Sequence, residues 1–267
     1  MPDTFFTVDV RPDGSEWFQP TDHARGPWDP DACHGGPPTG LLVRALERTV
    51  PTMRLTRISV DLGRPVPMAG FTIVTDVVRS GRATANTAAS IIDGDGKVRV
   101  SATGMHLAAQ PEPMFEGAMD NSATVTPRLA DAEPGPFPFA RAGHDLPGFR
   151  GAVELRYPPG EDNGPGATTV WMRAVPLLPD EEMSPFQRIC PLADCGNAFG
   201  RHAEPSAVQF VNTDLLIALH RDPIGEWMGS RATSVWQPSG QGLADALLFD
   251  DAGQVGRALQ TLLLRRS

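Results

Sequence analysis

Apolar and polar residues alternate along much of this chain, in runs that are rich in Val, Ile, Thr and aromatic side chains. Alternation of this kind is typical of strands that bury one face of a sheet. In the first part of the chain, the runs predict strands over residues 5–10, 16–19, 55–62, 72–79, 83–92 and 98–107. In the later part, they predict strands over residues 152–156, 168–173, 209–220, 227–237, 242–249 and 255–264.

Helical spacing of apolar residues replaces this alternation in the segment Leu41-Leu-Val-Arg-Ala-Leu-Glu-Arg48. Its apolar positions 41, 42, 45 and 46 share one face of a helix, and the segment follows the helix breakers Gly35-Gly-Pro-Pro38. We therefore predict a first helix over residues 39–49. A second helix is expected at roughly residues 192–202, at the corresponding place in the later part of the chain.

The predicted elements occur twice in the same order. Arg64-Pro-Val-Pro and Arg221-Asp-Pro-Ile each follow a strand and lie 157 residues apart (221 − 64 = 157). The hairpin signals Asp93-Gly-Asp-Gly96 and Asp250-Asp-Ala-Gly253 are separated by the same interval, and so are the strands that follow them. Each copy has a strand pair, one helix and several longer strands, which predicts an α+β fold made of two related units.

The two copies set the expected domain boundaries. Residues 1–109 form the first unit and residues 149–267 the second. Residues 110–148 between them are rich in Pro, Glu and Asp, so we expect a long linker that runs over the surface. The edge strands of the sheets would need cover, and for this reason we expect a homo-oligomer.

Composition and charge narrow the classes of function. The chain has 267 residues and a formal net charge of −9, which argues against nucleic acid or an anionic membrane surface as the main partner. It has no run of about 18 apolar residues and no signal pattern, so we expect no membrane insertion and a cytoplasmic location. The absence of a GxSxG motif disfavours a serine hydrolase.

The three cysteines, Cys33, Cys190 and Cys195, do not form a CxxC pattern, and the chain has no HExxH motif. Small buried thiols are the simplest interpretation of these residues. We therefore expect no metal and no cofactor.

Two uncharged amides, Asn212 and Gln260, fall at positions where the strand pattern points side chains inward. A buried amide without hydrogen-bond partners costs about 1–3 kcal/mol. Its partners could be neighbouring protein groups or a bound water molecule, and the sequence leaves both open. Thr103 lies 157 residues before Gln260 (260 − 103 = 157), so the first unit lacks this amide. We therefore predict a single site per chain, in the second unit.

Several motifs occur in an order that resembles a known family. They are Cys33-His-Gly-Gly-Pro-Pro-Thr-Gly-Leu-Leu, Pro-Leu-Ala-Asp194-Cys-Gly-Asn, Asn212-Thr-Asp-Leu, His220-Arg-Asp-Pro-Ile-Gly-Glu-Trp-Met, Gly240-Gln-Gly-Leu-Ala and Asp250-Asp-Ala-Gly-Gln-Val-Gly-Arg-Ala-Leu-Gln-Thr-Leu. Over about residues 14–108 and 150–267, the chain resembles the acyl-CoA thioesterase II family, in its actinobacterial thioesterase-like branch. The resemblance implies a double hotdog fold, in which each unit wraps an antiparallel sheet around a central helix.

The resemblance also implies acyl-CoA as the substrate and hydrolysis by direct attack of water. In the family, this water is held by an aspartate at the second helix, a threonine or serine on the next strand and a glutamine on the last strand. By position these are Asp194, Asn212 and Gln260. Asp194 would be the general base, although such a residue could also only cap its helix. Asn212 departs from the family pattern, but an amide can also donate to or accept from water.

Further residues are candidates for substrate binding. Thioester hydrolysis needs N–H donors for the oxyanion, and the start of the second helix near Cys195 and Gly196 could supply them. His34, Gly35 and Gly36 at the start of the first helix could line an acyl tunnel or position the substrate. The two glycines could equally serve a helix entry that needs unusual backbone angles.

Other interpretations of the same residues remain open. Asn212 also permits a catalytically weak protein that binds acyl-CoA or an acyl carrier. The spacing of Asp29 and His34 matches the Asp-to-His interval of hotdog enoyl-CoA hydratases, although the surrounding residues differ. Arg221 and Arg231 could contact the phosphates of CoA, or they could belong to a solvated face or a structural ion pair.

Overall fold

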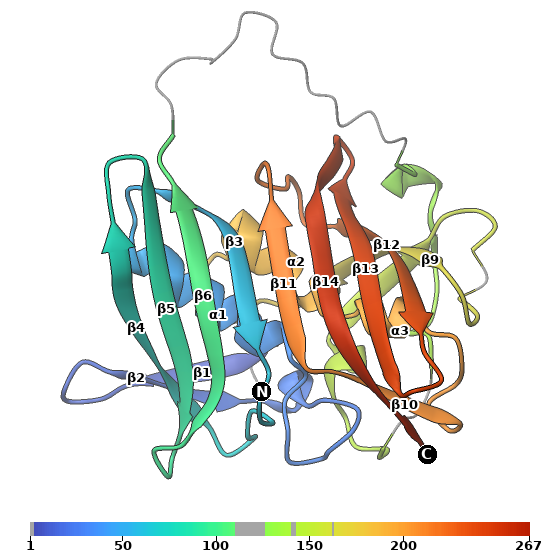
Figure 1. The fold of residues 1–267 in the computed structure, drawn as a ribbon, viewed down its shortest axis with the longest axis horizontal. Helices are drawn as coiled ribbons and strands as arrows, with labels where there is room; N and C mark the ends of the chain where they lie inside the picture. The colour runs from blue at the N-terminus through green and yellow to red at the C-terminus, as the bar shows by residue number, and fades with distance from the viewer. Residues whose placement is uncertain (1–2, 110–125, 140–142, 162) are drawn as a thin grey trace, which may run out of the picture.

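The structure of the chain, a computed structural model, describes residues 3–109, 126–139, 143–161 and 163–267. Among these residues, the first half contains one long helix and a series of strands (Figure 1). In chain order they are β1 (Phe6–Val10), β2 (Glu16–Pro20), a 3-10 turn (Asp22–Ala24), α1 (Gly36–Thr49), β3 (Arg54–Asp61), β4 (Phe71–Ser80), β5 (Thr84–Asp93) and β6 (Val98–Leu107).

The second half repeats this plan with additional short elements. A 3-10 turn (Leu129–Asp131), the two-residue strand β7 (Glu133–Pro134) and another 3-10 turn (Phe149–Gly151) come first. They are followed by β8 (Val153–Tyr157), β9 (Thr168–Ala174), α2 (Pro185–Ala193), α3 (Gly196–Phe199), β10 (Val208–Asn212), β11 (Asp214–Leu219), β12 (Met228–Trp236), β13 (Gln241–Asp250) and β14 (Gly253–Arg266).

All of these strands belong to one antiparallel sheet, in the order β1-β2-β4-β5-β6-β3-β11-β14-β13-β12-β9-β8-β7, with β10 beside β14. The two halves meet where β3 pairs with β11, with Ile58 opposite Ile217. Figure 1 shows the long strands of both halves side by side, with the helices packed behind them. The predicted α+β double hotdog fold is therefore confirmed, and most predicted strands agree with the structure to within two residues at each end.

The hairpin before the last strand is one residue shorter in the second half than in the first. This difference changes which side chains of that strand point inward. In the first half, Asp93 pairs with Lys97 across the turn, whereas in the second half Asp250 pairs with Gly253. A shift of one residue moves every later side chain of a strand to the opposite face. Thr103 is accordingly exposed on β6, and the prediction that it corresponds to Gln260 is wrong. The inward positions beside Thr103 are Ala102 and Gly104.

The core lies between the sheet and the central helices. Leu41, Leu42 and Leu46 of α1 are fully buried, as the helical spacing of the sequence predicts. α1 packs directly against α2, and both helices contact the sheet. The helix begins three residues earlier than predicted, because Pro37 and Pro38 lie in its first turn, where a missing N–H costs nothing.

The second helix differs more from the prediction. It begins at Pro185 instead of Leu192, and its first turn is capped by Ser184, whose side chain accepts a hydrogen bond from the Gln187 N–H at 3.2 Å. A serine followed by a proline is a strong helix-start signal. The strands of the two halves lie 157 residues apart, and this interval predicted a later start for the second helix. The helices begin at Gly36 and Pro185, so they are separated by a shorter interval than the strands. The chain turns at Asp194 before the short α3 begins.

The predicted surface linker is partly buried. Residues 110–125 and 140–142 lie outside the described residues, but the described part packs against the second half. Ala132 belongs to a small apolar cluster with Trp171 and Phe249, and the Leu129 N–H donates to Asp251 Oδ1 at 2.9 Å. Phe139 is buried against Ala198 and Phe210. The described part of residues 110–148 therefore follows the surface as predicted, except that Ala132, Pro138 and Phe139 are buried.

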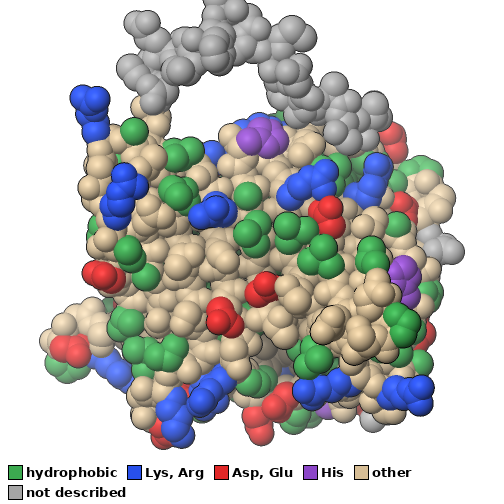
Figure 2. Space-filling view, viewed as in Figure 1, with side chains coloured by type: hydrophobic (Ala, Val, Ile, Leu, Met, Phe, Trp, Pro, Cys, Tyr) green, Lys and Arg blue, Asp and Glu red, His purple; other side chains and the backbone are tan. Residues whose placement is uncertain are grey.

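The outer face of the sheet is mixed in character. Figure 2 shows apolar side chains scattered among polar ones on this face, with basic side chains along its lower edge and across its upper part. The most exposed apolar side chains include Val74, Val77 and Val78 of β4 and Val235 and Leu243 on the paired strands β12 and β13. The expected homo-oligomer remains a prediction. Among the described residues, none of the helices is long and apolar enough to cross a membrane.

Candidate active site

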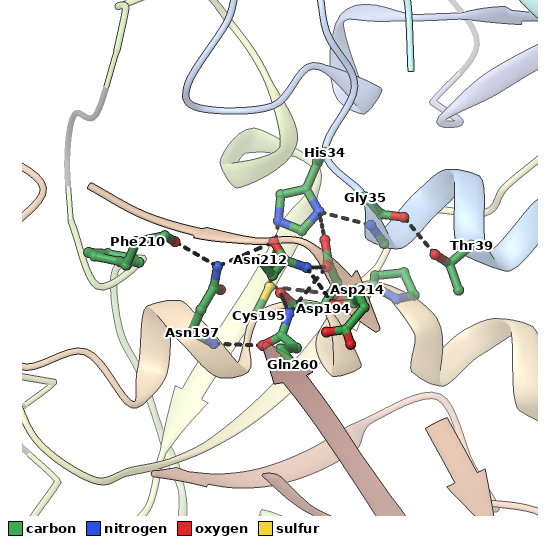
Figure 3. A network of polar contacts seen from close by, with 12 residues as sticks. His34, Gly35, Thr39, Asp194, Cys195, Asn197, Phe210, Asn212, Asp214 and Gln260 are labelled. Atoms are coloured by element: carbon green, nitrogen blue, oxygen red, sulfur yellow. Dashed lines mark hydrogen bonds and ion pairs between the residues drawn. The ribbon is translucent and has the colours of Figure 1, made fainter. Parts of the chain in front are cut away.

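Asp194 lies at the turn between α2 and α3, and its side chain points toward the start of α1 (Figure 3). The carboxylate is only 4% exposed. An ionised carboxylate at this depth needs several donors. Three side chains supply them: the Asn212 Nδ2–H donates to Oδ1 at 2.8 Å, Gln260 Nε2 lies 3.3 Å from Oδ1, and His34 Nδ1 lies 2.9 Å from Oδ2. The structure therefore brings Asp194, Asn212 and Gln260 together, as the sequence predicted.

Gln260 is held from both ends of its amide. Its Nε2 also donates to the Asp194 backbone carbonyl at 2.9 Å, and its Oε1 accepts from the Asn197 N–H at 2.9 Å. The side chain is 1% exposed, so the inward orientation predicted for β14 is correct. Its partners are all protein groups, which makes Gln260 a brace between α3 and the Asp194 turn.

Asn212 is half-buried at the end of β10. Besides its short hydrogen bond to Asp194, its Oδ1 accepts a long contact of 3.5 Å from Asn197 Nδ2. A threonine or serine hydroxyl at this position could donate to the same carboxylate oxygen. The amide therefore replaces the expected hydroxyl as a donor to Asp194.

His34 reaches the site from the first half of the chain, directly before α1 (Figure 3). Because an ionised carboxylate only accepts, the contact with Asp194 places the proton on Nδ1. The Gly36 N–H lies 3.2 Å from the same Nδ1. In this tautomer Nδ1 carries a hydrogen and cannot accept from the Gly36 N–H. The ring stacks flat on Phe149, with centroids 3.8 Å apart, which fixes its orientation. The site therefore lies between the two halves and not within the second unit alone.

Three of the predicted glycines are required by close approach to the polar residues. A Cβ on Gly35 would lie 3.0 Å from Asp194 Oδ2, and one on Gly36 would lie 2.9 Å from the Cα of Pro191. A Cβ on Gly196 would lie 2.9 Å from Gln260 Oε1. Gly35 has ordinary helical angles (φ −67°, ψ −27°), so unusual backbone angles are not the reason for this glycine.

A cavity of about 240 Å³ opens beside these residues. Asp194, Asn212, His34 and Gly35 belong to its wall, whereas Gln260, Cys195 and Gly196 are not among the described residues that line it. The rest of the wall comes from the loop before α1, the loop after β3, the linker, α3 and β10. Its apolar members include Trp28, Leu62, Val66, Phe137, Phe139, Ala198 and Phe210.

The expected oxyanion donors near Cys195 and Gly196 are not supported by this geometry. Both residues are buried behind the wall, and the Cys195 N–H donates to the Leu192 carbonyl at 2.9 Å. The N–H of Asn197, two residues after Cys195, donates to Gln260 Oε1 at 2.9 Å. The start of α1 offers an alternative. Pro37 and Pro38 have no N–H, so the groups available there are the N–H groups of Gly35 and Gly36.

Asp29 and Arg221, two further candidates, take structural positions. Asp29 lines the cavity, but its Oδ1 accepts from the Asp31 N–H, and the carboxylate that contacts His34 is that of Asp194. Arg221 forms two hydrogen bonds of 2.6 Å with the buried carboxylate of Asp250 and also bonds the Gly253 carbonyl. Arg221 is therefore a structural ion-pair partner, the interpretation that competed with a phosphate contact.

The cysteines are free, and two of them are fully buried. Burial raises the pKa of the Cys190 and Cys195 thiols well above the usual value, with a further contribution from nearby carboxylates. Cys195 Sγ lies 3.9 Å from His34 Nε2, but its thiol bonds the Pro191 carbonyl. The thiols therefore fit the predicted role of small buried residues.

Both halves of the chain match domains of one known protein family. Residues 24–107 match the acyl-CoA thioesterase N-terminal domain, and residues 126–264 match the acyl-CoA thioesterase C-terminal domain. The chain belongs to the acyl-CoA thioesterase family. Both matches together cover the two halves and the second half of the linker, in the order that the sequence repeat indicates. No curated protein matches this family member significantly in sequence.

Solved structures resemble this acyl-CoA thioesterase family member over nearly their whole length. A candidate thioesterase from Novosphingobium aromaticivorans has 19% identity and a TM-score of 0.73, with 99% of each chain covered. An acyl-CoA thioesterase II from Mycobacterium marinum has 18% identity and a TM-score of 0.66, covering 97% of this chain and 96% of the other. A hot dog protein of unknown function from Alicyclobacillus acidocaldarius has 15% identity and a TM-score of 0.69, covering 97% and 95%. These likenesses establish the shared fold.

Sequence reasoning missed the aromatic side of the cavity. Phe137 and Phe139 lie in the Pro-rich linker, where no periodicity marks a residue as buried. Trp28 lies in an equally irregular loop. Their only signal was the presence of large aromatic residues in segments of otherwise polar or turn-forming composition, which is a weak reason to expect burial.

Proposed function

We propose that this protein hydrolyses acyl-CoA thioesters by direct attack of water, with Asp194 as the general base. The observation that carries the proposal is the buried Asp194 carboxylate at the wall of the cavity, held by donors from three separate segments. Membership of the acyl-CoA thioesterase family supports acyl-CoA as the substrate class.

In the proposed reaction, a water molecule bound against Asp194 attacks the carbonyl carbon of the thioester. One proton of the water passes to the carboxylate as the new C–O bond forms. The C–S bond of the tetrahedral intermediate then breaks, and the proton on Asp194 passes to the departing sulfur. The products are a carboxylic acid and the free thiol of CoA. The proposed donor for the negative oxygen is the N–H group of Gly35, which belongs to the cavity wall at the positive end of α1.

The supporting residues have different parts in this proposal. His34 and Asn212 line the cavity beside Asp194 and can contact water or substrate directly. Gln260 acts through Asp194, because its amide nitrogen donates to Asp194 and it is not among the described residues that line the cavity. We therefore assign Gln260 to positioning of the base and not to holding the water. Asn212 donates to Asp194 as a hydroxyl would, which favours an active site over a merely binding one.

A second candidate function is hydration of an enoyl-CoA double bond. The observation that favours it is the contact between His34 and Asp194, since a histidine and a carboxylate from opposite walls can exchange protons with a substrate. This interpretation replaces Asp29 by Asp194 as the partner of His34. It requires that a trans-enoyl-CoA lose its conjugated double bond without release of thiol.

The test is to incubate the purified protein with a panel of acyl-CoAs, and to measure thiol release and loss of enoyl absorbance in parallel. We expect thiol release, and a decrease of about 10²-fold or more in kcat for Asp194→Asn, because removal of a positioned general base typically costs about 10²–10⁴-fold. The matched control is Asp245→Asn, which removes an exposed carboxylate paired with Arg257 on the outer face.

Each outcome decides between the proposals. Loss of enoyl absorbance without thiol release would favour hydration, and neither signal with any acyl group would refute the hydrolase. Thiol release that Asp194→Asn leaves unchanged would refute the site while leaving the activity intact. A decrease of the same size in Asp245→Asn would mean that the loss is not specific to the site.

A further inference from the structure

One side of the cavity is built almost entirely of aromatic rings. Trp28 and Phe139 both contact Phe210, with ring centroids 5.4 and 6.1 Å apart, and Phe137 meets Phe139 edge to face at 5.3 Å. Ala198 of α3 packs into the same cluster. The cluster lies two residues along β10 from Asn212, so a group bound beside Asp194 would extend into it.

The opposite side of the cavity is more exposed and carries the charged side chain of Arg64. Leu62 bonds the Thr213 carbonyl through its N–H, on the other side of Asn212 from Phe210. The chain then continues to Gly63 and the exposed Arg64, which also line the cavity. A charged CoA fits this side, and an apolar acyl group fits the aromatic side.

The linker part of the aromatic wall is locked to the body of the protein by Arg201. This side chain is 1% exposed, and its Nη2 donates to the carbonyl of Pro138, between Phe137 and Phe139, at 3.0 Å. The same nitrogen donates to the Asn163 carbonyl at 3.1 Å and pairs with Glu204 at 2.9 Å. An anchor with several acceptors holds the two phenylalanines as a fixed wall.

The size of the cavity limits what such a wall admits. Its volume of about 240 Å³ corresponds to roughly eight groups of the size of a water molecule, if each takes about 30 Å³. A methylene or a ring CH group is of similar size. A fixed wall therefore leaves space for at most about eight such groups, shared by the acyl group and the part of CoA that enters the cavity, and a palmitoyl chain alone would need about twice as much.

We propose that residues Phe137–Phe139, locked by Arg201, form the end wall of the acyl subsite and restrict the substrate to short acyl groups or acyl groups with a single ring. This inference rests on the proposed hydrolysis at Asp194. Phe139 is the specificity-determining residue, because it is buried against both Ala198 and Phe210 on the aromatic side of the cavity. Arg201 is a positioning residue that acts through the Pro138 carbonyl.

The experiment compares kcat/KM for hexanoyl-, octanoyl-, phenylacetyl-, dodecanoyl- and palmitoyl-CoA between wild type and variants. Wild type should prefer the first three. Phe139→Ala should raise the ratio of dodecanoyl to hexanoyl rates by roughly tenfold or more, since one methylene of fit changes specificity by about 10- to 200-fold. Arg201→Lys, which keeps the charge but loses the fork of donors, should shift the ratio in the same direction, with the change mainly in KM.

Ala198→Leu provides an opposite perturbation and serves if Phe139→Ala does not fold. It narrows the cavity, so octanoyl- and phenylacetyl-CoA should lose more activity than butanoyl-CoA. Phe249→Ala is the matched control, because this buried phenylalanine belongs to the separate cluster with Trp171 and does not line the cavity. It should lower stability and leave the order of substrates unchanged.

A wild type that prefers palmitoyl-CoA would overturn the inference, and so would an unchanged order of substrates in both Phe139→Ala and Ala198→Leu. If the wild type hydrolyses no acyl-CoA, the proposed function fails, and the inference is then decided by the affinities of non-hydrolysable alkyl-CoA thioethers. Tighter binding of hexyl- than of hexadecyl-CoA, reversed by Phe139→Ala, would support the wall. Equal affinities would refute it.

Discussion

The hydrogen bonds of Gln260 allow a quantitative test of its role as a brace. In Gln260→Leu, the side chain keeps most of its volume, but the Asn197 N–H and the Asp194 carbonyl lose their partner. Each buried backbone group left unpaired costs about 1–3 kcal/mol. The expected loss of unfolding free energy is therefore about 2–6 kcal/mol. This is a large part of the roughly 5–15 kcal/mol that stabilises an ordinary domain.

Gln260→Glu separates the two ends of the amide. The carboxyl group can still accept from the Asn197 N–H, but when ionised it cannot donate to Asp194 and places a second negative charge about 3 Å from Oδ1. Two carboxylates at this distance repel each other when both are ionised and therefore share a proton. The pair then binds this proton with a raised pKa. The unfolding free energy of this variant should be close to that of wild type below about pH 4, where the pair holds its proton. It should fall as the pH rises through the raised pKa of the pair.

Urea unfolding between acid and mildly alkaline pH measures these losses, and kcat is followed over the same range. Because a protonated carboxyl can donate to Asp194 as the amide does, kcat of Gln260→Glu should recover relative to wild type as the pH falls. The control is Gln241→Leu, which removes an exposed amide on β13 and should change stability by less than about 0.5 kcal/mol. A Gln260→Glu variant with wild-type stability and kcat at alkaline pH would refute the contact with Asp194.

Three further predictions concern other parts of the molecule. Gly35→Ala places a methyl group 3.0 Å from Asp194 Oδ2, so kcat should fall at least tenfold while the far-UV circular dichroism stays unchanged; full activity would contradict the close approach. Arg64→Ala should raise KM for acyl-CoA but not for the corresponding N-acetylcysteamine thioester, which lacks phosphates; an equal rise for both would exclude a phosphate contact. Burial alone would raise the pKa of Asp250, but hydrogen bonds, first of all from Arg221, hold it below the usual value. Asp250→Asn should therefore lose about 3 kcal/mol at neutral pH, and the difference from wild type in urea unfolding should close as the pH falls through that lowered pKa; a difference independent of pH would refute the ion pair.

The strands and the first helix could be predicted from the sequence because each carries its own periodicity. The start of the second helix could not be found in this way, since Pro191 interrupts its apolar pattern and Ser184 was the only strong signal. The polar set was predicted from motif order, but its geometry was not. The contacts of Gln260 depend on the position of the Asn197 N–H, and the motif that ends at Asn197 does not show where this group points.

The contact between His34 and Asp194 was also beyond the sequence, because the two residues lie in different halves and no local pattern connects them. The aromatic wall was missed for a related reason. Phe139 is buried and Phe137 is half-buried by long-range packing of an irregular segment, which has no periodic pattern of apolar residues. Local patterns therefore predicted the framework, whereas contacts between segments decided the shape of the cavity.

The one-residue difference between the hairpins explains why the two copies cannot have equivalent sites. With the longer turn at Asp93, the inward positions of β6 include Gly104, where a Cβ would lie 2.6 Å from Thr87 Oγ1 and 2.9 Å from a methyl group of Leu55. That space is filled by the core, and no amide can enter it. With the shorter turn at Asp250, Gln260 points inward at the corresponding level of β14 and reaches the Asp194 turn. The first half is then left to contribute the start of α1 and His34, so a complete site requires both halves.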